Sequence, residues 1–129
     1  PTPVFIVKKA ILNMPDKIGW RVLRHEVEHY LQWRDNRYSA DSFRQHSTPT
    51  FTPDEVKVLM HSEIEAYEAE CKLAKSIDAY YGPTDPCLEY EATGRRGVAS
   101  WLTRGYTQAI PAFKEHQAYM YYLVNHETW

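Results

Sequence analysis

The sequence predicts an α+β fold dominated by helices, in one domain spanning residues 1–129. Two long stretches carry apolar residues at helical spacing, and residues typical of helix ends flank them. Short runs of β-branched and apolar residues precede the first of these helices and predict a small β element. With 129 residues, of which 43% are hydrophobic and 25% charged, the chain can bury one core but hardly two.

The predicted β element consists of residues 4–7 and 10–12, and the first helix is expected over residues 16–34. Pro15 and Asp16 supply a turn and a cap-like carboxylate before this helix, and Asn36 can end it. An apolar stripe along the helix is expected to face the core. The positions of this stripe are Ile18, Val22, His25, His29 and Trp33.

A second long helix is expected over residues 53–81. Thr52 is its N-cap, a proline follows at the first helical position, and Glu55 completes a capping box. The Gly-Pro pair at 82–83 is expected to end the helix, and a turn is expected at residues 84–86.

The remaining chain predicts a polar loop over residues 37–51 and two further helices. These helices are expected over residues 97–109 and 112–126, on either side of Pro111. No internal repeat or low-complexity segment is visible in the sequence.

The sequence His-Glu-Val-Glu-His at positions 25–29 carries the strongest functional signal. On a helix, His25 and His29 lie one turn apart on the same face and can share one tetrahedral zinc ion. Glu26 lies about 100° round the helix, beside the two ligands. A carboxylate there can accept a proton from water whose pKa the metal has lowered. The motif therefore predicts zinc (Zn2+) as the cofactor and Glu26 as the general base.

The second long helix supplies the expected third ligand, because a catalytic zinc usually has three protein ligands. Glu65 and Glu68 fall on the charged face of this helix, whereas Glu63 and Glu70 fall in an apolar arc. Carboxylates are costly to bury there unless they are paired or bind a metal. Glu63 is therefore predicted as the third ligand. Glu70 is expected either to bond the free ring nitrogen of a ligating histidine or to pair with a buried arginine or tyrosine.

The histidine motif, followed on a later helix by Glu63 with an alanine three positions on, resembles the zincin metallopeptidases. Within them the chain is similar to minimal, single-domain gluzincins. The resemblance covers residues 16–34 and 53–81 and implies a zinc endopeptidase acting on a protein or peptide. It also implies that both motif histidines and Glu63 bind zinc and that Glu26 is the general base and acid. Many gluzincins carry Asp or Asn one position after the alanine, where this chain has Tyr67.

Further expectations come from resemblance alone. Gluzincin-like sites often use a tyrosine or histidine to stabilise the oxyanion, and Tyr106, His116 and Tyr119 are all candidates, with none assigned. Small domains with this motif and no leader also resemble the C-terminal toxin cassettes of bacterial delivery systems. That likeness implies an exported or injected effector domain, with a longer parent delivery protein or a cognate inhibitor as its partner.

A different ligand set would use Asp35, which stands where metzincins have their third ligand. Gln32, however, replaces the glycine that lets the chain swing back to the metal in that family. Peptide deformylases share the histidine motif but take a cysteine ligand from an earlier strand, whereas Cys71 and Cys87 both follow the motif. These two cysteines fit either a disulfide, and hence an oxidising environment, or two reduced thiols.

Composition narrows the function classes. No run of about 18 apolar residues predicts a membrane span, and no charged leader precedes an apolar run. A net charge of -2 with scattered basic residues argues against nucleic acid as a partner. Two classes remain: a zinc endopeptidase, and a non-catalytic module that binds zinc structurally or packs as a helical interaction domain. Glu26 favours the enzyme, because a structural site needs no base beside an open coordination position.

Overall fold

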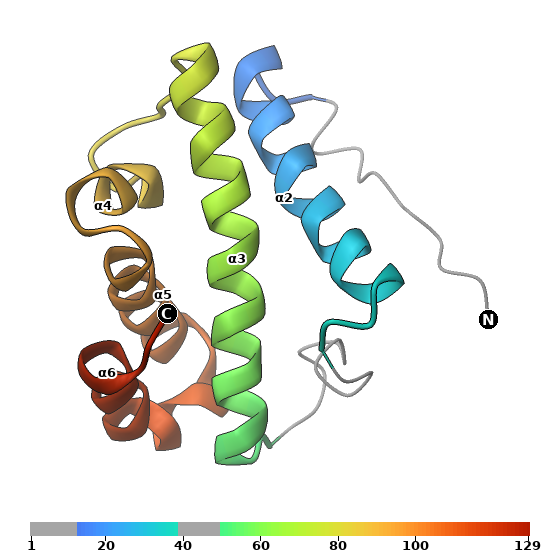
Figure 1. The fold of residues 1–129 in the computed structure, drawn as a ribbon. Helices are drawn as coiled ribbons and strands as arrows, with labels where there is room; N and C mark the ends of the chain where they lie inside the picture. The colour runs from blue at the N-terminus through green and yellow to red at the C-terminus, as the bar shows by residue number, and fades with distance from the viewer. Residues whose placement is uncertain (1–12, 39–49) are drawn as a thin grey trace.

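The computed structural model describes residues 13–38 and 50–129 (Figure 1). The described residues contain helices and no strand, so the predicted α+β class is wrong and the architecture is that of a small all-α domain. The expected strands at residues 4–7 and 10–12 lie outside the described part of the chain. The helices are α2 (Asp16–Arg34), α3 (Pro53–Ile77), α4 (Pro86–Thr93), α5 (Arg95–Ala109), the 3-10 helix η2 (Pro111–His116) and α6 (Gln117–His126).

The long helix α3 stands in the middle, with α2 along one side and α4, α5 and α6 on the other (Figure 1). Helices α2 and α3 run antiparallel. Arg21, near the start of α2, reaches Glu70 in the later part of α3, whereas Gln32, near the end of α2, reaches back to Ser62. Residues far apart in sequence therefore meet in register along one seam.

The apolar core lies on only one side of α3, between this helix and α5, η2 and α6. Burying an aliphatic or aromatic side chain there contributes roughly 1.5–3 kcal/mol each. None of the described helices is long and apolar enough to cross a membrane. The buried core residues are Val56, Leu59, Met60, Ile64, Val98, Ala99, Leu102, Phe113, Met120, Leu123 and Val124.

The other side of α3 faces a polar seam with α2. The buried residues of α2 are Arg21, His25, Glu28 and Gln32, which follow the 4, 3, 4 spacing of one helix face. The predicted stripe is therefore wrong for its apolar members, because Trp33 is 43% exposed and Ile18 and Val22 are only half-buried. Its His25 is buried, as expected. The polar face turns inward because α3 presents carboxylates and a backbone carbonyl that satisfy its side chains.

The helix ends agree in part with the sequence. The capping box of Thr52 and Glu55 is confirmed. Helix α3 ends at Ile77, before the predicted residue 81, because Asp78 adopts the left-handed conformation (φ 51°, ψ 57°) and closes the helix. The expected helix over residues 112–126 is split into η2 and α6.

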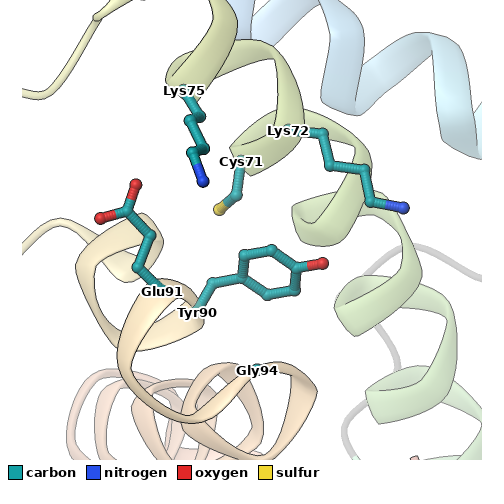
Figure 2. A pocket seen from close by; sticks show the side chains of 6 residues that line it. All are labelled: Cys71, Lys72, Lys75, Tyr90, Glu91 and Gly94. Carbon is teal, nitrogen blue, oxygen red and sulfur yellow. The ribbon is translucent and has the colours of Figure 1, made fainter.

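Helix α4 was not expected from the sequence, which predicted only a turn there. Asp85 begins this helix by accepting a hydrogen bond from the backbone N–H of Cys87 at 2.9 Å. Cys87 also forms a disulfide with Cys71 of α3, which is one of the two states that the sequence left open. Beside this disulfide lies an open hollow between α3 and α4 (Figure 2). Its lining residues are Cys71, Lys72, Lys75, Tyr90, Glu91 and Gly94.

Candidate metal centre

Two histidines of α2 and one glutamate of α3 converge in the polar seam. One ligand atom from each of His25, His29 and Glu63 lies within 4.8 Å of the other two. The Nε2 atoms of the histidines are 3.1 Å apart, and His25 Nε2 lies 3.7 Å from Glu63 Oε1. His29 Nε2 contacts the same carboxylate oxygen. Within residues 13–38 and 50–129, this is the one group of three His, Cys, Asp or Glu side chains arranged in this way.

The geometry of the three donors fits a tetrahedral zinc ion. Bonds of about 2.0–2.2 Å in a tetrahedral site place the ligand atoms about 3.4 Å from one another. The distances from His25 Nε2 to its two neighbours lie on either side of that value. The contact between His29 and Glu63 is closer and would open slightly around an ion. Two imidazole nitrogens and one carboxylate oxygen also form a donor set that zinc prefers.

The ring of His29 is oriented by Gln32. The Gln32 Nε2 donates to the backbone carbonyl of Ser62 at 2.9 Å, and a carbonyl oxygen can only accept. The Gln32 Oε1 therefore faces His29 Nδ1, 2.9 Å away, and requires the proton on that nitrogen. This tautomer leaves His29 Nε2 as the atom directed at the centre of the site.

The ring of His25 is oriented by Glu70 in a similar way. Glu70 Oε1 lies 3.2 Å from His25 Nδ1, at ion-pair distance although without the alignment of a regular hydrogen bond. A carboxylate beside Nδ1 favours a proton there, so that Nε2 faces Glu63 and the second histidine. Glu70 thus makes both contacts that the sequence offered as alternatives, because its other oxygen accepts from Arg21 Nη2 at 2.8 Å.

The electrostatics of the cluster follow from burial and opposite charge. Burial alone would lower the pKa of His25, but the carboxylates of Glu63 and Glu70 outweigh it and raise the pKa to about 9. Burial alone would raise the pKa of Glu63, but the two histidines hold this pKa well below its ordinary value. In the metal-free protein, His25 is therefore a cation between two carboxylates at neutral pH.

Aromatic side chains close the inner side of the cluster. Tyr106 of α5 donates a hydrogen bond to Glu63 Oε2 at 3.0 Å, so the oxygen opposite the histidines is also held. Burial, together with the charge of Glu63, raises the pKa of Tyr106 and keeps its hydroxyl protonated. The ring of Tyr67 packs edge-on against His25, with ring centroids 4.4 Å apart. Tyr67 therefore supplies a packing surface beside His25 and no carboxylate.

The other residues named from the sequence lie in different surroundings. Glu26 is exposed on α2, one residue after His25, and nothing in the described chain hydrogen-bonds its carboxylate. Asp35, the alternative ligand, lies at the exposed C-terminal end of α2 and is paired with Arg34 at 2.8 Å. Of the three oxyanion candidates, Tyr106 hydrogen-bonds Glu63 of the cluster, whereas His116 of η2 lies beside Glu115 and Tyr119 belongs to α6.

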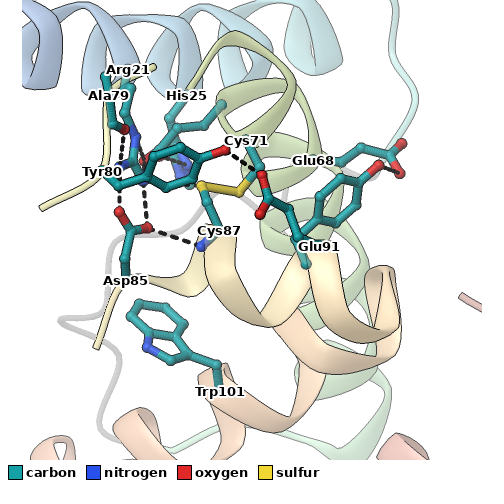
Figure 3. The surroundings of a disulfide bond; sticks show 12 residues. Arg21, His25, Glu68, Cys71, Ala79, Tyr80, Asp85, Cys87, Glu91 and Trp101 are labelled. Carbon is teal, nitrogen blue, oxygen red and sulfur yellow. Dashed lines mark hydrogen bonds and ion pairs between the residues drawn. A yellow bond between two sulfur atoms is a disulfide. The ribbon is translucent and has the colours of Figure 1, made fainter. Parts of the chain in front are cut away.

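A buried arginine links the cluster to the disulfide (Figure 3). Arg21 is fully buried and donates to Glu70 on one side and to both carboxylate oxygens of Asp85 on the other, at 2.6 and 2.8 Å. It also donates to the backbone carbonyl of Ala79 at 2.9 Å and to Cys87 Sγ at 3.0 Å. One chain of contacts therefore runs from His25 to the start of α4.

Sequence reasoning did not assign roles to Arg21, Gln32 or Asp85. The signal for the first two was present, because they stand four residues before His25 and three after His29 on one helix face. Asp85 followed by a proline is a helix-start pattern, although it also fits the turn that was predicted.

Comparisons of the chain with protein-family models, with curated proteins and with solved structures found no match.

Proposed function

We propose that this protein is a zinc-dependent peptidase whose centre is formed by His25, His29 and Glu63. The observation that carries the proposal is the convergence of three ligand atoms of suitable chemistry. Glu26 is exposed and directly follows the ligand His25 on α2. A structural zinc site normally has four protein ligands, whereas three ligands leave one position for a reactant. The exposure of Glu26 keeps its oxygens accessible to water.

Each residue has a defined task in this proposal. Gln32 and Glu70 hold the two imidazoles with their Nε2 atoms inward, and Tyr106 holds the carboxylate of the third ligand. The orientation of the ligands is thus fixed before a metal binds, which reduces the entropy lost on binding.

When bound, zinc would supply a Lewis acid that polarises a peptide carbonyl and lowers the pKa of water. Glu26 accepts the proton of the attacking water and passes it to the nitrogen of the departing amine, as a general base and then a general acid. Hydrolysis of a peptide bond needs both of these proton transfers.

The test is hydrolysis of dye-labelled casein, an unfolded substrate, by zinc-loaded protein. Glu26→Gln should retain zinc and lose at least about 100-fold in rate, since general acid–base catalysis contributes about 10²–10⁴-fold. Asp35→Asn, an isosteric change on the same helix, should retain both zinc and activity. Hydrolysis at the wild-type rate by Glu26→Gln would contradict the proposal.

The same contacts would also serve a module without catalysis. His25 and His29 already contact the Glu63 carboxylate and each other, so all three side chains have partners without a metal. A protein that binds no zinc when supplied with the metal would favour this alternative, a helical interaction domain with a polar seam. A protein that binds zinc but leaves casein intact would favour a structural zinc module.

A further inference from the structure

We propose that the Cys71–Cys87 disulfide is a thiol-exchange site that controls the metal centre. In this proposal an anionic thiol of the glutathione class attacks Cys71 from the open hollow, and Cys87 leaves as a thiolate beside Arg21. The opened bridge then weakens the support that Glu70 gives to His25. The last step rests on the proposed function, whereas the exchange chemistry does not.

The two sulfurs differ in access. Cys71 lines the hollow between α3 and α4, and Figure 2 shows its sulfur directed toward the space between Lys75 and Tyr90. Cys87 is not part of that lining and is fully buried. The lining carries two exposed lysines, Lys72 and Lys75, against one carboxylate, Glu91, so an anionic thiol is attracted to the hollow more strongly than a neutral one.

Side chains partly cover the access to the Cys71 sulfur. Cys71 is 3% exposed, and the ring of Tyr80 lies over the disulfide with its hydroxyl hydrogen-bonded to Glu91 (Figure 3). Glu91 is exposed at the hollow and Tyr80 is half-buried beside the disulfide, so both side chains can rotate without a change in the backbone. A small thiol therefore has a route to Cys71 that a protein reductant lacks.

The surroundings of Cys87 Sγ favour its departure as a thiolate. Arg21 Nη2 lies 3.0 Å from Cys87 Sγ, and Cys87 lies in the first turn of α4, where the helix dipole favours negative charge. A stabilised thiolate leaves faster in disulfide exchange. Attack by one thiolate forms a new S–S bond to Cys71 and expels Cys87 as a thiolate. A second thiolate attacking that mixed disulfide completes the two-electron reduction and expels Cys71.

The consequence for the metal centre follows from the residues next to each cysteine. Glu70 precedes Cys71, and Asp85 stands two residues before Cys87, so the bridge ties together the two carboxylates that hold Arg21. Opening the bridge releases α4 from α3 and adds a third anion to the same guanidinium. The hold of Arg21 on Glu70 then loosens, and the contact of Glu70 with His25 loosens with it. We expect zinc affinity to fall about 10-fold, as when other supports of a ligating histidine are lost.

The first experiment maps the exchange on the wild-type protein. Brief exposure to glutathione, an acid quench and alkylation of free thiols would be followed by peptide mass spectrometry. The mixed disulfide is expected on Cys71, with alkylated Cys87. Lys75→Gln should slow the reaction with glutathione but not with neutral 2-mercaptoethanol, and Lys114→Gln, at an exposed position in η2, should slow neither. Adducts mainly on Cys87 would overturn the proposal.

The second experiment measures zinc affinity by competition with a chromophoric chelator. The oxidised wild type is compared with a Cys71→Ala/Cys87→Ala variant, each with and without Glu70→Gln, with folding followed by circular dichroism. Loss of the bridge should lower affinity about 10-fold with Glu70 present and hardly at all with glutamine there. If the double-alanine variant does not fold, the purified glutathione adduct of the wild type replaces it.

The outcomes separate the two proposals. Equal zinc affinity with and without the bridge would overturn the control of the metal centre and leave the proposed function intact. Absence of zinc binding in the oxidised wild type would overturn both, while the adduct map would still decide the exchange chemistry. An equal loss of affinity in the Glu70→Gln background would also overturn the coupling, because the effect would then not pass through Glu70.

Discussion

Replacement of Arg21 by methionine should destabilise the protein strongly. Methionine keeps an unbranched aliphatic chain but removes the guanidinium, which is fully buried and donates to Glu70, Asp85, Ala79 and Cys87. The carboxylates that remain are 7% and 0% exposed, so they keep little hydration. Removing one partner of a buried ion pair costs about 3–5 kcal/mol, a large part of a typical stability of about 5–15 kcal/mol.

This loss converts into a measurable shift of the thermal midpoint. With an unfolding entropy of about 2.1 cal/mol/K per residue, 3–5 kcal/mol corresponds to a decrease of about 10–20 °C for a chain of this length. The assay is thermal unfolding of the oxidised, metal-free protein at pH 7, followed by circular dichroism. Arg34→Met is the matched control on the same helix, because Arg34 pairs with Asp35 in solvent, and its midpoint should hardly change. A decrease of less than about 3 °C for Arg21→Met would refute the assignment of this arginine as the buried link.

Three further predictions follow from the described contacts. Zinc binding at pH 7 should release about one proton, because the pKa of His25 is raised to about 9 in the metal-free protein. Titration calorimetry in buffers of different ionisation enthalpy measures the number of protons released. Binding without proton release would contradict the charged state of His25. Because its pKa is raised on folding, His25 stabilises the metal-free fold fully below pH 6.5, and this stabilisation is lost as the pH rises through 9. Because its pKa is lowered on folding, Glu63 stabilises the same fold above pH 4.5, and this stabilisation is lost in acid. Urea unfolding should therefore show greatest stability between about pH 4.5 and 6.5, and an unchanged alkaline limb in His25→Gln would speak against this origin. Gly97→Ala should destabilise the protein by about 1–3 kcal/mol, because a Cβ there would lie 2.3 Å from the carbonyl oxygen of Glu89. The control Gly105→Ala meets nothing within 4 Å and should stabilise the protein by about 0.5–1 kcal/mol in the same urea assay. Equal effects of the two substitutions would contradict the close packing of α4 on α5.

Local sequence signals predicted the long helices and three residues of the cluster. The histidine motif and the capping box are short-range patterns, and the separation of Glu63 and Glu70 from the charged face depends only on helical periodicity. These features need no knowledge of the partner helix. The structure brings the three predicted ligands together, while their binding of zinc stays a prediction.

The inward face of α2 could not be predicted by the same means. Apolar periodicity assigns polar residues to solvent, but Arg21 and Gln32 are buried because their partners lie 49 and 30 residues away on α3. Tyr106 reaches Glu63 across 43 residues. Such pairings depend on how the helices pack, which a pattern within one helix does not contain. The short helix α4 was missed because eight residues give too few turns for periodicity to register.

The most direct test of the central claim is the zinc content of purified, metal-replete protein, measured by elemental analysis. We expect one zinc per chain in the wild type and in Asp35→Ala, and a large loss of zinc in His25→Ala and Glu63→Ala variants that remain folded. Retention of zinc without Glu63, or its loss with Asp35, would contradict the proposed ligand set. A wild type without zinc would contradict the metal centre itself.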